Sequence, residues 1–500
     1  MDRTAWFPGR FMLIERMAQD TVYDLCIIGA GIAGLNALFV ARQYLPPGAR
    51  VALIDRHEQA GGMWNATYDY VRLHQPHPMF TAGDIDWQLS KPKTYLATGA
   101  EVQAHLAYCL ATLSRGLTIE PYWAHDATHL TETETRDGPL VEIDLTACDP
   151  ARGSQRLCAR RVIHAKGLDI PVSAPLKLSS DAVISTTPQA LGPHALKGRD
   201  IYVIGGGKTG MDTVLHLANI SGRGALHLIA GKGTLFTNRD QFFPTGLQRY
   251  FSQTSNLKTT IDIAMRFDGD NAPAVFEHFR DQYSSSPEGR GEHFLFGILS
   301  PAEGARIADA TQTIQYDYLS DVIDTETGPQ LQLRQGACLP LAAGSVIVNC
   351  TGLVFRSDSV EPPLLSPGGM ILSINARQSF NFLSSVSAYF LTHLFYTGQI
   401  ETVPFYVLDQ NALMRADRKT WQVSGTAQGL LNALLMSEAL PFKVFRQFGL
   451  DFDRWHPPHK RLAGLIDLQL NRKKYVRHCR QVLDDVATRH QVLCAPLRRV

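Results

Sequence analysis

Two glycine-rich stretches have the residue types and the spacing to bind a nucleotide. The first, GAGIAG at positions 29–34, follows the apolar run YDLCII and precedes apolar residues at helical spacing. Gly29 permits a tight turn after a strand, Gly31 lets the backbone approach a pyrophosphate, and Gly34 lets the helix pack closely on the strand. The amino end of that helix offers N–H groups and a partial positive charge to phosphates. The stretch therefore predicts a dinucleotide site rather than an ordinary turn.

The acidic residue expected in such a site is also present. Asp55 ends the apolar run RVALID, 21 residues after Gly34, where its carboxylate can accept hydrogen bonds from a ribose. Arg56 follows it, and we include it among the predicted cofactor contacts.

The second stretch, GGGKTG, follows the apolar run IYVI and repeats the same order of strand, turn and helix. Three glycines and two possible phosphate donors follow one another in it: Gly205, Gly207, Lys208, Thr209 and Gly210. The spacing excludes a Walker loop, which needs about four residues between its first glycine and G-K-[ST]. Two glycine loops in one chain predict two bound nucleotides.

The residues after the next strand indicate which nucleotide the second loop binds. The run LHLIA at 226–230 ends without an acid and is followed by Lys232. A carboxylate at this point favours the free 2′-hydroxyl of NAD, whereas a nearby cation favours the 2′-phosphate of NADP. We therefore expect NADPH, with Lys232 as a contact. NADH and a solvated Lys232 remain the alternative.

The stretch that follows Asp55 resembles a known superfamily. Gly61 and Gly62, followed by Met63 and Trp64, resemble the G-G-x-W run of the flavin-containing monooxygenases (class B flavoprotein monooxygenases), in which this loop lies against FAD. YVRLHQP resembles the Y-x-S-L-x-T-N stretch of the same enzymes, with Gln75 where many of them have Asn near the flavin ring. The resemblance implies that Gly62, Met63, Trp64 and Gln75 contact FAD.

The same resemblance implies an activity. NADPH would reduce FAD, a C4a-(hydro)peroxyflavin would form with O2, and a small organic substrate would be oxygenated at nitrogen, sulfur or carbon. Such chemistry depends on the cofactor and on a dry pocket and needs no nucleophilic side chain. Gln75 is then the best candidate for a catalytic residue near the peroxide, and Arg72 and His74 are weaker ones.

Other stretches bear on which subclass of the superfamily the chain resembles. LFTNRDQFFP at 235–244 and AYFLTHL at 388–394 look somewhat like ornithine and lysine N-hydroxylases, or else are ordinary aromatic core. The F-x-G-x-x-x-H hallmark of the superfamily is not properly present, since LGPH at 191–194 sets the glycine and His194 too close together.

The order of these motifs predicts an α/β fold with two Rossmann-like dinucleotide-binding domains, the NADPH domain inserted into the FAD domain, and a helical C-terminal extension. The strand ends VIHAKG and VIVNCTG resemble the A-T-G motif that joins the FAD domain to its partner, and Thr351 and Gly352 in the second give the better match. We read the strand at 344–352 as a return to the first domain. The expected boundaries are 20–195 for the first part of the FAD domain, 196–340 for the NAD(P)H domain with an insertion at 234–310, 341–408 for the FAD-domain return and 409–500 for the extension.

The cysteines argue against one acceptor for the electrons of the reduced flavin. All eight are scattered without a C-x-x-C pair, which argues against a disulfide-reductase centre, a zinc site and a disulfide framework. The chief alternative to oxygenation is an NAD(P)H-dependent flavoprotein reductase or oxidase that passes electrons to another acceptor or a protein partner.

Composition limits the partners. The 500 residues carry a net charge of +1, so no overall field attracts nucleic acid. We expect no leader and no membrane span, a cytoplasmic location, a small-molecule substrate with O2, and a possible homo-oligomer. Residues 442–500 carry 13 Lys and Arg against 5 Asp and Glu, which we read as a solvated helical face or a subunit contact.

Overall fold

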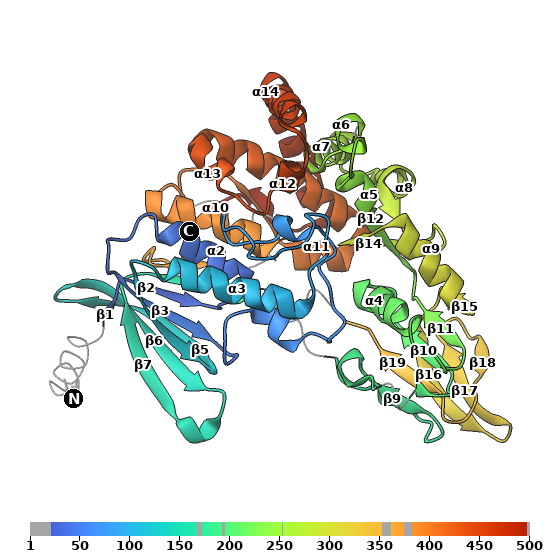
Figure 1. Cartoon of the computed structure of the whole chain (residues 1–500). Coiled ribbons are helices and arrows are strands. Elements are labelled where there is room, and N and C mark those ends of the chain that lie inside the picture. Colours follow the sequence, from blue (N-terminus) through green and yellow to red (C-terminus); the bar gives the residue numbers. More distant parts are fainter. Residues whose placement is uncertain are drawn as a thin grey trace, which may run out of the picture.

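The structure, a computed structural model, describes residues 22–167, 173–192, 196–252, 254–352, 362–374 and 383–497. Two parallel five-stranded sheets dominate it, one on each side of the view in Figure 1. The first has the order β20-β8-β2-β3-β4 and the second has the order β15-β11-β10-β19-β9. The predicted fold, two Rossmann-like units with a helical C-terminal region, is confirmed.

The first unit is layered on both faces of its sheet. Its strands are β2 (Leu25–Ile28), β3 (Arg50–Asp55), β4 (Thr118–Trp123), β8 (Val162–His164) and β20 (Ile371–Ser373). On one face lie α2 (Ile32–Ala41), α3 (Gly99–Leu113) and α10 (Ser384–Thr397), which packs along α2. The other face packs against a sheet formed by β1 (Val22–Tyr23), β5 (His125–Thr135), β6 (Gly138–Ala147) and β7 (Ser154–Ala159). The strands are buried apolar runs because both faces are covered.

The second unit repeats this plan. Its strands are β9 (Ile184–Thr186), β10 (Ile201–Ile204), β11 (Leu226–Ile229), β15 (Thr313–Gln315) and β19 (Val346–Asn349). Helices α4 (Lys208–Leu217) and α9 (Pro301–Ala310) pack together on one face. A three-stranded sheet of β16 (Leu319–Thr325), β17 (Gly328–Leu333) and β18 (Cys338–Pro340) covers the other.

One strand belongs to a different sheet from the one that we predicted from the sequence. We expected the strand at 344–352 to return to the first domain, but β19 pairs in parallel with β10 and β9 in the second sheet. The strand that returns to the first sheet is β20, which pairs with β8. The error has a physical reason: a short apolar strand buried on both faces carries no pattern that says which sheet it joins. The second sheet thus draws strands from both sides of the predicted range 196–340.

The predicted insertion and extension supply most of the remaining elements. The insertion contains β12 (Thr234–Asn238), α5 (Arg239–Phe242), α6 (Gln248–Phe251), α7 (Asn256–Arg266), α8 (Ala272–Tyr283), β13 (Ser284–Ser285) and β14 (His293–Leu299). The extension contains β21 (Tyr406–Leu408), α11 (Gln410–Ala416), α12 (Arg418–Ala439), α13 (Phe442–Arg446), the short helix η6 (Phe452–Trp455), α14 (Pro458–His490) and β22 (Cys494–Pro496). Helices α7 and α8 pack on α12, so the insertion and the extension form one helical layer (Figure 1).

Three buried histidines make the fold sensitive to acid. Burial lowers the pKa of His105 to about 3 and the pKa values of His393 and His456 to about 4. The pKa of histidine in an unfolded chain is about 6.5. Below that pH the unfolded chain therefore binds protons that the folded chain does not bind. We expect the free energy of unfolding to fall as the pH drops from about 6.5 toward 4, by roughly 1–2 kcal/mol per histidine at pH 5. Urea unfolding at stepped pH measures this, and His393→Gln should make the dependence shallower. A stability that is flat from pH 6.5 to 5 would contradict it.

Candidate functional site

In the first glycine loop two glycines pack against backbone carbonyls and the third faces another glycine. Gly29 has φ +105°, and a Cβ there would lie 2.4 Å from the Ala165 carbonyl oxygen. A Cβ on Gly34 would lie 1.8 Å from the Gly29 carbonyl oxygen. Gly31 instead faces Gly62, with 3.3 Å from a Cβ on Gly31 to the Gly62 Cα. Two residues without side chains thus face each other at the amino end of α2, and no side chain caps that helix.

The second glycine loop also has two glycines packed against backbone carbonyls, but its middle glycine is open. Gly205 has φ +127°, and a Cβ there would lie 2.7 Å from the Cys350 carbonyl oxygen, while a Cβ on Gly210 would lie 1.9 Å from the Gly205 carbonyl oxygen. A Cβ on Gly207 would have no atom within 4 Å. No side chain caps α4, whereas Thr98 and Ser300 cap α3 and α9 with full capping boxes. Uncapped N–H groups beside an open glycine are what an anionic pyrophosphate requires.

Asp55, the predicted ribose ligand, is held by the protein itself. It is 6% exposed; its Oδ2 accepts a hydrogen bond from the Ala30 N–H at 2.6 Å, and its Oδ1 accepts one from the His57 N–H at 2.9 Å. The carboxylate therefore fixes the first glycine loop relative to β3. Its contact with a ribose remains a prediction, as does that of Arg56, whose guanidinium lies at the surface 3.8 Å from Asp126.

The G-G-x-W stretch forms the short helix η1 (Gly62–Ala66) directly over the first loop. Met63 is 54% exposed, and Trp64 packs edge to face on Phe80 with ring centroids 5.7 Å apart. Further along, Gln75 is only 6% exposed, and its Oε1 is buried without a hydrogen-bond partner in the part of the chain that the structure describes. A buried, unpaired amide oxygen is costly unless a bound group satisfies it.

Arg72 does not share this environment. Its side chain is exposed, and the guanidinium donates to the Leu96 carbonyl at 3.0 Å and to the Tyr95 hydroxyl at 3.3 Å. These contacts hold it on the loop surface, and they give its predicted catalytic role no support.

The stretch between η1 and Gln75 also contacts the second unit. The Tyr68 hydroxyl donates to Asp212 on α4 at 2.9 Å, and Asp212 also pairs with Lys208. The Tyr70 ring stacks on His216 of the same helix, 4.0 Å between centroids. One stretch of chain therefore touches both glycine loops.

His74 fastens the same stretch to the insertion. Its carbonyl accepts a hydrogen bond from Arg239 Nε at 2.7 Å, and its Nδ1 accepts one from the Ile298 N–H at 3.2 Å. Burial, aided by the positive charges of Lys208 and Arg239, lowers the pKa of His74 to about 3, so the ring is neutral and can accept. The sequence ranked His74 as a weak catalytic candidate. Its bridging contacts, like those of Tyr68, had no sequence signal because the partners lie far along the chain.

The side chains of Lys208 and Thr209 contact other residues of this chain, and they also lie beside the predicted phosphate position. The Lys208 ammonium pairs with Asp212 one turn further along α4, and the Thr209 side chain hydrogen-bonds the Tyr68 hydroxyl. Both residues lie in the first turn of α4, next to the open Gly207.

Lys232 follows β11 at the rim of the second unit. It is about half exposed and pairs with Glu292 at 3.1 Å. Two more cations lie over tyrosine rings that follow β15, with Arg290 5.7 Å from the Tyr316 centroid and Arg334 4.7 Å from the Tyr318 centroid. The Tyr318 ring also lies against Gly231. Three cations thus lie near the end of β11, together with the carboxylates of Glu288 and Glu292.

The A-T-G-like motif at Thr351 and Gly352 is in a different place from the one expected. It follows β19, and the carbonyl just before it covers Gly205, so it belongs to the second glycine loop and not to the first. In the first unit the corresponding position is the end of β8, where Ala165 covers Gly29 and Lys166 follows. The Thr351 hydroxyl and N–H both donate to Asn349 Oδ1. His194 of the missing hallmark lies outside the described residues.

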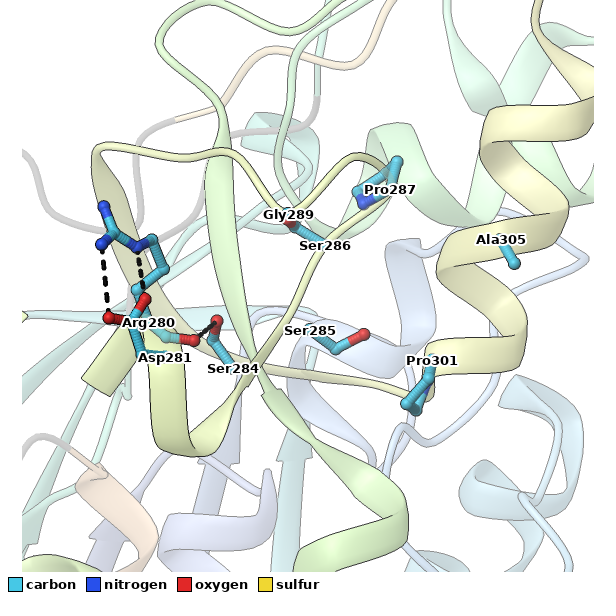
Figure 2. Close-up of a pocket in the computed structure, with 9 residues that line it drawn as sticks. All are labelled: Arg280, Asp281, Ser284, Ser285, Ser286, Pro287, Gly289, Pro301 and Ala305. Atoms are coloured by element: carbon cyan, nitrogen blue, oxygen red, sulfur yellow. Dashed lines mark hydrogen bonds and ion pairs between the residues drawn. The ribbon is translucent and has the colours of Figure 1, made fainter. Parts of the chain in front are cut away.

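A surface hollow of about 470 Å³ lies apart from these residues. Figure 2 shows it between the end of α8, the segment 284–289 and the start of α9, with Arg280 paired to Asp281 at its edge. None of the predicted site residues lines it. Within the described ranges no group of His, Cys, Asp and Glu is placed to hold a metal ion, and no helix is long and apolar enough to cross a membrane.

Comparison with known proteins agrees with the two-unit fold. A family model described as pyridine nucleotide-disulphide oxidoreductase matches residues 23–260. Uncharacterized proteins of Mycobacterium tuberculosis and Mycobacterium bovis are 47% identical over 211 residues, which is 40% of this chain and 36% of theirs. The match thus spans about a third of the length of these curated relatives.

Among solved structures, the open form of a cyclohexanone monooxygenase aligns with a TM-score of 0.51 at 14% identity, covering 86% of this chain and 99% of that one. An oxidized steroid monooxygenase bound to NADP aligns with a TM-score of 0.50 at 14% identity, covering 91% and 98%. An ornithine N-hydroxylase of Kutzneria sp. 744 aligns with a TM-score of 0.48 at 11% identity, covering 76% and 99%. At these identities the likeness to the cyclohexanone and steroid monooxygenases shows a shared fold.

Proposed function

We propose that this chain, which has the fold of the flavin-dependent monooxygenases, is an NADPH-dependent, FAD-containing monooxygenase of small organic substrates. The observation that carries the proposal is the stretch from η1 to Gln75. It lies against the first glycine loop at Gly62 and against α4 of the second loop at Tyr68 and Tyr70. Two nucleotides bound at these loops would have the same residues between them.

The residues present fit both cofactors. FAD would be held at the first loop by Gly31, Gly62 and the uncapped start of α2, with Asp55 and Arg56 toward the ribose. NADPH would be held at the second loop by Gly207, Lys208 and the uncapped start of α4, with Lys232 toward the 2′-phosphate. The open Gly207, the facing glycines Gly31 and Gly62, and the unpaired Oε1 of Gln75 support this assignment.

A bound flavin supplies hydride acceptance from the nicotinamide and activation of O2. The protein's part is to position the rings and to exclude water. The amide of Gln75 is available to hydrogen-bond a group bound next to it. His74, the preceding residue, is neutral and neither donates nor accepts a proton near neutral pH. Ile298, which binds His74, belongs to an apolar cluster with Met79, Phe242, Phe243 and Trp455, and we propose this cluster as one wall of the substrate pocket.

The test is the fate of O2. The purified protein should be yellow, should oxidise NADPH in the presence of a suitable amine, sulfide or ketone, and should place one atom of ¹⁸O2 in the product. If all of the consumed O2 appears as hydrogen peroxide with every substrate, the oxygenase proposal fails and the reductase or oxidase alternative replaces it.

Nucleotide preference gives a paired prediction. Lys232→Ala removes the cation nearest the predicted 2′-phosphate and should lower kcat/KM for NADPH by about tenfold. It should leave kcat/KM for NADH unchanged. Glu292→Gln removes the carboxylate that now pairs with Lys232 and should raise the preference for NADPH. Steady-state rates with both nucleotides measure the two effects, and equal losses with NADPH and NADH in the lysine variant would contradict this role.

A further inference from the structure

Helix α14 carries apolar side chains on two opposite faces, and one of them is uncovered. Gly464, Tyr475 and Cys479 are buried against the body of the molecule. On the opposite side, large side chains at helical spacing stand in solvent: Leu462 is 58% exposed, Leu465 44%, Ile466 49% and Leu470 80%. Scattered exposed apolar residues are normal, but several on one helical face mark a contact surface.

A neighbouring segment extends this surface. Around α6, Leu247 and Phe251 are each 75% exposed and Tyr250 is 55% exposed. The Tyr250 ring stacks on His459 at the start of α14, with centroids 6.3 Å apart and planes at 14°. In Figure 1, α14 stands out from the rest of the molecule beside α6 and α7. We call these three residues and the four on α14 the α6–α14 ridge.

Basic side chains continue the exposed face of α14 beyond the ridge, since Lys473 and Arg477 stand seven residues after Ile466 and Leu470. Arg461, Lys473, Lys474 and Arg477 are exposed on α14. The single acid in the same stretch of the helix, Asp467, is engaged by the Tyr475 hydroxyl at 2.8 Å. Residues 442–500 as a whole carry 13 Lys and Arg against 5 Asp and Glu. We therefore expect the occupant to be apolar where it meets the leucines and negatively charged where it meets the helical turns that follow them.

We propose that the α6–α14 ridge lies on an anionic lipid surface, with its apolar side chains at the acyl boundary and its lysines at the level of the phosphates. An apolar helical face bordered by Lys and Arg is the pattern of a helix that lies in a lipid interface. A second copy of this chain suits the ridge less well, because it would bring like charges together. The proposal does not depend on the oxygenase activity.

Flotation with vesicles of phosphatidylcholine, with and without phosphatidylglycerol, tests the full chain in its yellow form. The wild type should float only with the anionic vesicles, and less at high salt. The triple variant L462Q/I466Q/L470Q should stay in solution. K473Q/K474Q should partition more weakly, by roughly fivefold per lysine removed. The matched control L493Q changes an exposed leucine outside the ridge (56% exposed) and should float like the wild type.

Glutamine retains helix propensity and the sites are exposed, so thermal unfolding and flavin absorbance should match the wild type in every variant. The proposal is overturned if the wild type floats with neither vesicle, or if the triple variant floats as well as the wild type. It is also overturned if sedimentation velocity shows a dimer that the triple variant dissociates while no vesicle binds, which would assign the ridge to a second copy.

Discussion

Replacing Gln75 with Leu is expected to stabilise the cofactor-free protein while lowering its turnover by roughly 10²-fold. The two effects have opposite signs because the Oε1 of Gln75 is buried without a partner. Leucine removes that unsatisfied acceptor at similar volume, so the free energy of unfolding should rise by about 1 kcal/mol. The same change removes a fixed dipole at the proposed flavin site, and losing one such group typically costs about 10²–10³ in rate.

The matched control is Gln399, whose Oε1 is also buried and unpaired but which follows α10, away from both loops. Gln399→Leu should give the gain in stability without the loss in turnover. Arg72→Ala should leave turnover unchanged, since its guanidinium is occupied at the surface. Urea unfolding of the apo-proteins and NADPH-dependent turnover measure the set. If Gln75→Leu lost stability and kept its rate, Gln75 would be a packing residue only.

The second large effect separates two glycines three positions apart. Gly207→Ala should fold normally, because its φ of −80° suits any residue and a Cβ there meets nothing within 4 Å. We expect a stability within about 1 kcal/mol of the wild type. The new methyl group would occupy the approach to the pyrophosphate, so the Kd for NADPH should rise about tenfold or more, about 1.4 kcal/mol.

Gly210→Ala should fail for a different reason. Its Cβ would lie 1.9 Å from the Gly205 carbonyl oxygen, a backbone atom that cannot move without separating α4 from β10. We expect the free energy of unfolding to fall by about 3 kcal/mol or more. Little folded protein should then be obtained. Thermal unfolding and titration of NADPH distinguish the two variants. Unaltered NADPH binding by Gly207→Ala would remove the second loop from the proposed site.

One constraint in each glycine loop was predictable from the sequence because it is local. Gly29 and Gly34, or Gly205 and Gly210, meet within one turn of chain, so the spacing alone carries the geometry. Gln75 was found through resemblance, and the structure added the reason to test it, which is its unpaired oxygen. The binding roles of these residues stay predictions.

The parts that could not be predicted depend on distant contacts. The side chain of Arg72 has the chemistry for a catalytic role, but Arg72 is exposed on its loop. A β-bridge between the backbones of Arg72 and Thr98 fixes that loop. The strand β19 was assigned to the wrong sheet because its partner β10 lies far back in the chain. The contacts of Tyr68 and His74 with the second unit were missed for the same reason.

The strand order of the second sheet limits how this protein can be divided. Residues 196–340, expressed alone, would lack β9 and β19, and β10 would become an edge strand with one row of backbone groups exposed to solvent. Such a fragment should aggregate rather than bind NADPH. An isolated nicotinamide module, or one exchanged between homologues, would therefore have to run from β9 to β19, because only that longer span carries all five strands of the second sheet.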